Sequence, residues 1–405
     1  MLKQITPAEA VEILLSQSVR LQKEDIPLWD AWGRVLAEDM KAVCPVPPFD
    51  RSPYDGYALR SADTAAASEN TPVTLQITEE IAAGAVPARE VGLGQAAKVL
   101  TGAPVPRGAD CVVKYELTRF TANTVTLSSP FFPGNIIRAG EDVSAGAVAA
   151  VQGTVINSGI LGILAGQGYD LLPAWKRPRI AVLSTGPELV EAGLPLPPGK
   201  IYSTNFHTLS GILREAGAVP EDAGIVPDDP AAIADCICRS TEGADMVLMT
   251  GGASVGDYDF ALRALELAGG KMLFQRVRCR PGGAMLAGTV EGKMVLCLSG
   301  NPGAAAAGLL RVGMPYIRKL CGWKDVYPSQ MRVILRRPYE KPSPQSRLVW
   351  GRLLVEDGCA FFDASEGQNS SGISSLAHCD LLAEIPAGTP PLAAGTLVTA
   401  YRISG

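Results

Sequence analysis

The sequence predicts an α/β multidomain protein, and three observations support that prediction. At 405 residues the chain is too long for one ordinary domain. Between residues 176 and 322, apolar runs of strand length alternate with helical segments, which is typical of a doubly wound sheet. Elsewhere, short alternating runs are cut by Gly and Pro, which indicates β domains. We therefore expect a central doubly wound α/β domain, an inserted mainly-β domain, a split N-terminal domain and a C-terminal β barrel or sandwich domain.

The elements follow in order along the chain. Thr6 and Glu9 have the spacing of a capping box, so a helix is expected at the start. Alternating runs at 73–77 and 112–114 predict strands of the inserted domain, and runs at 331–335, 348–354 and 381–384 predict strands of the last domain. The expected domains are 1–45 with 139–175, 46–138, 176–322 and 323–405.

The α/β stretch gives the clearest prediction of local structure. Strands are expected at 180–184, near Gly224, and at 246–249, 273–277 and 294–298. Helices are expected at 205–215, from Pro230, from Tyr258 and after Pro302. Helices of this length between strands imply that ligands bind at the carboxyl ends of the strands.

Composition excludes several classes of function. The net charge of -5 argues against a general nucleic-acid surface. Nine cysteines without a CxxC pair predict reduced core residues rather than ligands. Because His207 and His378 are the only histidines, a zinc site built on histidines and a Ser-His-Asp triad are nearly excluded. Without a signal pattern or an unbroken apolar span, the chain is expected to be cytoplasmic, with no membrane partner.

Polar and glycine-rich segments follow several of the predicted strands, at 184–188, 228–230, 250–260 and 299–302. Glycine lets the backbone approach a ligand closely, and carboxylates can hold a metal ion near a phosphate. Each segment also has a structural interpretation. The loop at 250–260 could be a turn in which Asp257 caps a helix, and Asp228 or Asp229 could cap the helix that begins at Pro230.

Arg276, Arg278 and Arg280 alternate along the last part of a predicted strand, so their side chains should project from one face. Guanidinium groups suit phosphates and other tetrahedral oxyanions. The alternative is a charged edge strand that is protected against pairing with other chains.

Eight blocks resemble, in the same order, the molybdopterin molybdenumtransferase family, which includes the E domain of gephyrin. They lie at 48–58, 101–104, 108–110, 140–142, 184–189, 250–260, 280–282 and 300–302. The family combines a split first domain, an inserted β domain, a molybdopterin-binding α/β domain and a C-terminal β domain. The resemblance therefore implies the same architecture as the pattern of strands and helices does.

The resemblance implies that molybdate is inserted into adenylylated molybdopterin with release of AMP, which completes the molybdenum cofactor with the help of Mg²⁺. Hard carboxylates suit Mg²⁺ near a phosphoanhydride. The implied catalytic positions are Asp55, Thr101, Asp142, Glu188, Asp228 and Asp259, of which Glu188, Asp228 and Asp259 would lie near the metal. Asp142 and Glu188 are the candidates for activating water or relaying protons.

The implied substrate-binding positions are spread over the α/β and C-terminal domains. Arg276, Arg280, Arg352 and Ser370 are candidates for holding molybdate. The remaining substrate-binding positions are Ser184, Thr185, Gly251, Gly252, Ser254, Gly256 and Pro302.

The family further implies a homodimer in which the inserted domain helps to complete the partner's site. Other cofactor-biosynthesis proteins and apo-molybdoenzymes are further implied partners.

Two departures from the family pattern keep alternatives open. The usual KPGKP-like turn is Arg280-Pro281-Gly282-Gly283-Ala284, with one basic residue fewer, and the usual Asn-Pro-Val-Ser block is Asn301-Pro302-Gly303-Ala304. Arg in place of Lys brings a planar fork that could change the preferred oxyanion. A tungstate-preferring paralogue and a non-catalytic molybdopterin-binding or scaffold protein are the alternatives. An enzyme that shares only the α/β module is disfavoured by the blocks outside that module.

Overall fold

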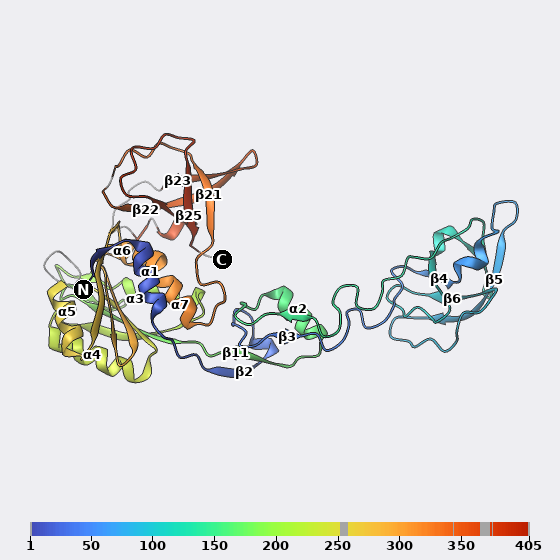
Figure 1. The fold of residues 1–405 in the computed structure, drawn as a ribbon, viewed down its shortest axis with the longest axis horizontal. Coiled ribbons are helices and arrows are strands. Elements are labelled where there is room, and N and C mark those ends of the chain that lie inside the picture. Colours follow the sequence, from blue (N-terminus) through green and yellow to red (C-terminus); the bar gives the residue numbers. More distant parts are fainter. Residues whose placement is uncertain (1, 252–257, 343, 365–372, 375, 404–405) are drawn as a thin grey trace. The chain divides into compact units, whose positions relative to one another are not determined.

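The computed structural model describes residues 2–251, 258–342, 344–364, 373–374 and 376–403. The chain divides into two compact units (Figure 1). The first unit comprises Met1–Glu38, Gln152–Ile156 and Leu171–Gly405, and the second comprises Asp39–Val151 and Asn157–Asp170.

A seven-stranded sheet is the centre of the first unit. Its order is β1 (Leu2–Ile5), β17 (Lys271–Val277), β19 (Leu286–Val290), β20 (Lys293–Leu298), β16 (Met246–Thr250), β12 (Arg179–Thr185) and β15 (Val219–Val226). The last four strands of this order are parallel, so their carboxyl ends lie at one edge of the sheet. β19 runs antiparallel to both of its neighbours, so the sheet is mixed.

Helices cover both faces of this sheet, as expected for a doubly wound domain. Within β12, Ile180 and Val182 pack in one apolar cluster, while Ala181 and Leu183 pack in another on the opposite face. The first cluster includes side chains of α1 (Pro7–Ser16), α3 (Asn205–Glu215), α6 (Pro302–Gly308) and α7 (Met314–Leu320). The second includes side chains of α4 (Pro230–Gly243) and α5 (Tyr258–Leu267).

The start of α1 shows how a local pattern becomes a helix end. Thr6 Oγ1 accepts a hydrogen bond from the Glu9 amide at 3.2 Å, and the Thr6 amide donates to Glu9 Oε2 at 2.7 Å. These reciprocal bonds confirm the predicted capping box. A π-helical turn, Leu309–Gly313, joins α6 to α7.

The sequence-based assignment of this domain differs from the structure in several places. It does not include β1 at the edge of the sheet, or the short paired strands β13 (Leu189–Val190) and β14 (Ile201–Tyr202). It also omits β19, a short strand that is stabilised by pairing on both sides. The prediction that one strand carries Arg276, Arg278 and Arg280 is also wrong. β17 ends at Val277, Arg276 has a φ of +65°, and β18 (Cys279–Arg280) pairs with a strand of a different sheet.

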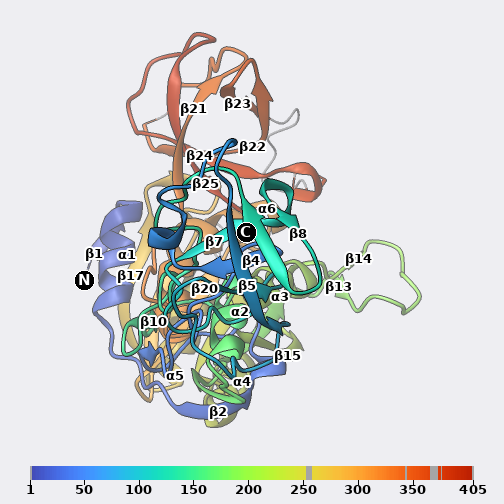
Figure 2. The ribbon, with the colours of Figure 1, turned by 90° about the vertical axis from the view of Figure 1, so that its right-hand side faces the viewer.

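That second sheet is a closed barrel at the C-terminal end of the chain (Figure 2). Its strands follow the order β22 (Ser346–Glu356), β23 (Cys359–Ala364), β21 (Gln330–Leu335), β25 (Leu397–Arg402) and β24 (Leu381–Ile385). β24 pairs back onto β22 and closes the ring. Arg311 of the π-helical turn contacts Glu384 of β24 at 2.6 Å, and the Tyr401 hydroxyl donates to the same carboxylate at 2.8 Å. This partly buried cluster connects the barrel to the α/β domain.

The chain leaves and re-enters the first unit through paired strands. β2 (Lys23–Pro27) pairs with β11 (Leu171–Trp175) in an antiparallel ribbon. Segments on either side of the insertion therefore pair with each other, as a split N-terminal domain requires. β2 is followed by a 3-10 turn at Leu28–Asp30.

The second unit is mainly β, as expected for the inserted domain. Its six-stranded sheet has the order β7 (Cys111–Lys114), β4 (Gly56–Leu59), β6 (Gln95–Val99), β5 (Val73–Ile81), β9 (Thr124–Leu127) and β8 (Arg119–Phe120). It also contains β3 (Met40–Lys41), β10 (Val148–Ala150) and α2 (Ser158–Gly166), and 3-10 turns at Ser61–Thr64 and Tyr115–Leu117.

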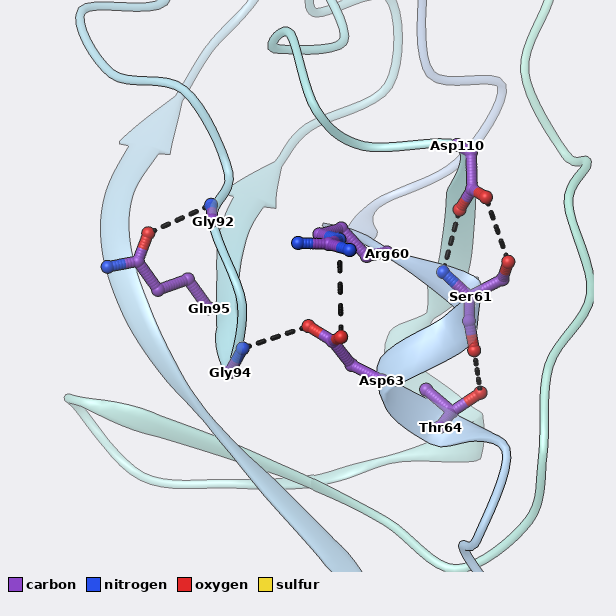
Figure 3. Close-up of polar contacts among 8 residues, drawn as sticks. All are labelled: Arg60, Ser61, Asp63, Thr64, Gly92, Gly94, Gln95 and Asp110. Carbon is purple, nitrogen blue, oxygen red and sulfur yellow. Dashed lines mark hydrogen bonds and ion pairs between the residues drawn. The ribbon is translucent and has the colours of Figure 1, made fainter.

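Carboxylates tie the turns of this unit to its strands (Figure 3). Asp110, just before β7, accepts hydrogen bonds from the Ser61 amide at 2.7 Å and the Ser61 hydroxyl at 2.8 Å. Asp63 accepts from the Gly94 amide at 2.9 Å. Asp110 therefore stabilises the 3-10 turn that begins at Ser61.

Two further sequence-based expectations can be compared with the structure. Five of the nine cysteines are buried, and all nine are free thiols, which agrees with reduced core residues. In the part of the chain that the structure describes, no helix is both long and apolar enough to cross a membrane.

Candidate functional site

A cavity of about 1150 Å³ opens in the first unit where several strands of the α/β sheet end. Side chains and backbone from four strand ends, from the β17–β18 segment and from the barrel line it. Seven of the implied catalytic and substrate-binding positions belong to this lining: Thr185, Glu188, Asp228, Gly251, Arg276, Arg280 and Pro302. The structure therefore brings together positions that lie more than a hundred residues apart in the chain.

The end of β12 supplies one hydroxyl that faces the cavity and one that does not. Ser184 is buried, and its Oγ accepts a hydrogen bond from Thr250 Oγ1 at 3.3 Å. Thr185 lines the cavity with only 4% of its surface exposed, and its Oγ1 has no hydrogen-bond partner among the residues that the structure describes. A buried hydroxyl without a partner is costly, so Thr185 is positioned to bond a ligand. Glu188 follows after a turn and adds a carboxylate.

Two adjacent aspartates after β15 have separate roles. Asp229 is the N-cap of α4, and its Oδ1 accepts from the Ala232 amide at 2.8 Å. Asp228 lines the cavity instead. The capping interpretation therefore applies to Asp229, and Asp228 contributes its charge to the cavity.

Gly251 places the end of β16 directly against β12. Its φ is +99°, and a Cβ built on it would lie 2.3 Å from the Thr185 carbonyl oxygen. Only glycine allows this approach. Gly252, Ser254, Gly256 and Ser370 lie outside the described residues, and of Asp259 the structure describes only its backbone in α5.

Asn205, the first residue of α3, is a cavity residue that the sequence reasoning did not single out. Its side chain is 8% exposed, and Nδ2 donates to the Gly300 carbonyl at 2.8 Å. Its Oδ1 is buried and has no hydrogen-bond partner in the described part of the chain. Asn205 thus connects the start of α3 to the loop before α6 and offers an acceptor to a ligand. An Asn at the start of a predicted helix was the available signal.

Arginines form the basic wall of the cavity. Arg276, Arg278 and Arg280 all line it, although they do not share one strand. The turn that follows is tightly packed, because a Cβ on Gly283 would lie 2.3 Å from the Val277 and Cys279 carbonyl oxygens. The basic residue missing at position 283 therefore has no room for its side chain in this backbone.

Arg352 lies on β22 of the barrel. Its side chain is exposed, and Nε donates to the His378 carbonyl at 2.9 Å. This bond holds the guanidinium beside the 3-10 turn Leu376–His378.

The remaining predicted positions belong to the second unit. Asp55 Oδ1 accepts hydrogen bonds from the Thr101 amide at 2.7 Å and from Thr101 Oγ1 at 2.8 Å. These bonds hold the pKa of Asp55 below its usual value, and the charge of Lys98 adds to the effect. Asp142 is exposed, and its amide donates to the Val46 carbonyl at 3.0 Å. The structure thus joins Asp55 with Thr101 and leaves Asp142 on a separate loop.

Glycine also shapes the Asp55 segment. A Cβ on Gly56 would lie 2.1 Å from the Val113 carbonyl oxygen of the neighbouring strand β7. Gly56 therefore lets β4 approach β7 closely directly after Asp55. The Tyr115 amide then donates to the Asp55 carbonyl at 3.3 Å, which fixes the backbone that carries the carboxylate.

Three family models match the chain. Residues 5–168 match the MoeA N-terminal region (domain I and II), residues 181–319 match a probable molybdopterin binding domain, and residues 332–403 match the MoeA C-terminal region (domain IV). Together these matches cover most of the sequence.

Named relatives and solved structures agree with these matches. Molybdopterin molybdenumtransferase of Staphylococcus epidermidis is 31% identical over 97% of this chain and 94% of its own length. The Staphylococcus aureus protein of the same name is 31% identical over 96% of this chain and 93% of its own length. The crystal structure of a molybdopterin biosynthesis MoeA protein from Pyrococcus horikoshii has a TM-score of 0.85 and 29% identity, and covers 98% of this chain and 100% of its own. The chain therefore belongs to the molybdopterin molybdenumtransferase family of molybdenum cofactor biosynthesis proteins.

Proposed function

We propose that this protein is a transferase that inserts molybdate into adenylylated molybdopterin and releases AMP. One observation carries the proposal: a single cavity combines three arginines with the carboxylates Glu188 and Asp228. Adenylylated molybdopterin contains a phosphoanhydride, and molybdate is a tetrahedral oxyanion. A cavity that offers both guanidinium and carboxylate groups suits a reaction that joins these two anions.

Arg276 and Arg280 are the proposed molybdate ligands, together with Arg352 and Ser370 of the C-terminal domain. Guanidinium groups form charge-assisted, forked hydrogen bonds to oxyanions. Thr185 and Asn205 would complete the polar contacts, because each has a buried oxygen that no described residue hydrogen-bonds. The N–H groups of a pterin ring could satisfy both oxygens. Ser184, Gly251, Gly252, Ser254, Gly256 and Pro302 are proposed to shape the same substrate site.

Mg²⁺ is the proposed cofactor, and the donor set fits it. Among the described residues, no group of three His, Cys, Asp or Glu side chains could hold a metal ion. Magnesium, however, is commonly bound by one or two carboxylates together with substrate phosphates. Glu188 and Asp228 would hold it here, with Asp259 as the third proposed ligand. When bound, Mg²⁺ would neutralise charge on the phosphoanhydride.

Asp55 and Thr101 of the inserted domain and Asp142 of the split N-terminal domain are the other proposed catalytic residues. Thr101 keeps Asp55 ionised through two hydrogen bonds, so this carboxylate can orient a hydrogen-bond donor of the substrate. Asp142 and Glu188 are the proposed proton relays. We further propose a cytoplasmic homodimer in which the inserted domain of one copy completes the site of the other, and which passes its product to apo-molybdoenzymes. The domain boundaries proposed from the sequence are 1–45 with 139–175, 46–138, 176–322 and 323–405.

The test is AMP release from purified adenylylated molybdopterin, with and without Mg²⁺, and with molybdate, tungstate or neither. The native chain would be compared with Asp228→Ala, and with Asp235→Ala as a control, because Asp235 is an exposed residue of α4. We expect oxyanion-dependent AMP release that is lost in Asp228→Ala and kept in Asp235→Ala.

The same assay separates the other functions. Preferential release with tungstate would identify a tungstate-preferring enzyme. Tight binding of adenylylated molybdopterin without any AMP release would refute the transferase and identify a binding or scaffold protein. AMP release that does not depend on an oxyanion would indicate simple hydrolysis of the phosphoanhydride.

A further inference from the structure

Arg278 lies on the basic wall of the cavity but is not among the proposed molybdate ligands Arg276, Arg280 and Arg352. It is exposed, and it lines the cavity together with Arg276 and Arg280. Its position between these two arginines places a third guanidinium group on a short stretch of backbone. The question is whether this group is a surface charge or part of the site.

The backbone around Arg278 is held from two sides. The Arg278 amide donates to the Ile5 carbonyl of β1 at 2.7 Å, and the Arg278 carbonyl accepts from the Ser346 amide of β22 at 3.2 Å. Arg278 is therefore the residue at which the chain passes from the α/β sheet to the barrel. A residue bonded to both sheets has a defined position on the cavity wall.

The two residues that flank Arg278 differ from it in exposure to solvent. Val277 and Cys279 are buried, with 3% and 2% of their surfaces exposed. Both also line the cavity with their neighbours, but Arg278 between them is exposed, so its side chain is accessible on a backbone that is anchored on either side. All three arginines line the cavity although the regular strand ends before Arg278.

The charge of Arg278 is available to a ligand. Among the described residues no carboxylate forms a salt bridge with Arg278. The pKa of Glu9 is lowered mainly by its hydrogen bonds to Thr6, and the charge of Arg278 is the last of the causes. Glu9 Oε2 is already bonded to the Thr6 amide and hydroxyl in the capping box. The guanidinium retains N–H donors for a bound anion.

We propose that Arg278 binds a tetrahedral oxyanion in this cavity as a third guanidinium ligand beside Arg276 and Arg280. The oxyanion is either molybdate or a phosphate of the nucleotide substrate, which share the same hydrogen-bonding chemistry. This inference rests on the proposed function, because it concerns the same cavity. It adds a binding residue that the resemblance does not assign.

The test compares Arg278→Ala and Arg278→Lys with Arg239→Ala. Arg239 is an exposed arginine of α4, and it serves as a control for the loss of a surface charge. Equilibrium binding would be measured with sodium molybdate alone and with sodium pyrophosphate alone. The concentration dependence of AMP release on molybdate and on adenylylated molybdopterin would be measured in parallel.

We expect Arg278→Ala to weaken binding of one of these oxyanions by roughly 10- to 100-fold, because a hydrogen bond to a charged group is lost. Arg278→Lys should retain part of the affinity, since it keeps the charge but not the planar fork. A shift confined to molybdate identifies the metal oxyanion as the ligand, and a shift confined to pyrophosphate and adenylylated molybdopterin identifies a phosphate.

The proposal is overturned if Arg278→Ala changes neither affinity more than Arg239→Ala does. If the native chain binds these anions but releases no AMP, the proposed transferase activity is refuted. The role of Arg278 is then still tested by the binding measurements. The two failures are therefore distinguishable. Circular dichroism of Arg278→Ala would verify that the fold is kept, which is expected because the side chain is exposed.

Discussion

Substitution of Gly251 by alanine should destabilise the first unit because two backbone segments meet at this residue. Gly251 has a φ of +99°, and an added Cβ would lie 2.3 Å from the Thr185 carbonyl oxygen and 2.5 Å from Thr185 Oγ1. Either β16 or β12 would have to move. Since Thr185 and Gly251 both line the cavity, that movement would also change the substrate site.

The magnitude has two parts. A non-glycine residue at positive φ costs about 1–2 kcal/mol. Forcing a methyl group into a packed site costs a further 1–3 kcal/mol or so. Gly193 isolates the first part, because its φ is +92° and a Cβ built on it would have no heavy atom within 4 Å. We therefore expect Gly251→Ala to lower the free energy of unfolding by roughly 1–3 kcal/mol more than Gly193→Ala does.

Urea unfolding followed by tryptophan fluorescence is the appropriate assay. All five tryptophans, at positions 29, 32, 175, 323 and 350, belong to the first unit. Their signal therefore reports unfolding of the unit that contains Gly251 and is not obscured by the inserted domain. The affinity for adenylylated molybdopterin would be measured on the same two variants.

Equal destabilisation by Gly251→Ala and Gly193→Ala would refute the reasoning. It would mean that the contact with Thr185 relaxes without cost and that the two strand ends are not rigidly placed. Stronger destabilisation without any loss of affinity would show that the strand ends are packed together but that the substrate does not depend on them.

Three further predictions concern side chains. Asp229→Ala should lower the stability of the first unit by about 1 kcal/mol, because the cap of α4 is lost. Asp228→Ala should abolish AMP release with little change in stability, and equal losses of stability in the two variants would contradict this division of roles. In a carbon-13 NMR titration, Asp55 should have a pKa below 3.8, and Thr101→Val should raise it part of the way back, because the backbone donor remains. The stability that this carboxylate contributes is therefore present above pH 3.8 and lost as the pH falls through the lowered pKa. If Asp55 titrates in Thr101→Val as it does in the native chain, the Thr101 hydroxyl does not lower its pKa. At neutral pH iodoacetamide should modify the two exposed cysteines long before Cys297, whose pKa burial raises to about 12, and early modification of Cys297 by mass spectrometry would contradict its burial.

Local patterns in the sequence were sufficient to predict those elements whose structure depends on neighbouring residues. The capping box at Thr6 and the helix that begins at Pro230 were predicted because their hydrogen bonds join residues three positions apart. The strand at β16 was predicted because its apolar run is buried on both faces of the sheet. The order of strands and helices then led to the fold class without any knowledge of strand pairing.

Local patterns did not predict the position of residues whose partners lie far along the chain. The alternation of Arg276, Arg278 and Arg280 suggested one strand, but pairing with β22 draws the second half of that segment into the barrel. β19 was missed because antiparallel pairing on both sides, rather than its own sequence, stabilises it. Asn205 was missed because the Gly300 carbonyl that accepts a hydrogen bond from its Nδ2 lies 95 residues further along the chain.

The sequence by itself determined the fold class, the family and the kinds of side chain available for anion and metal binding. Only the tertiary structure decided that Asp228 faces the cavity while Asp229 caps a helix, and that Arg278 stands beside the other two arginines. The physical reason is that periodicity and capping are encoded over a few residues. The surroundings of a side chain, in contrast, are set by contacts between segments that the sequence separates by a hundred residues or more.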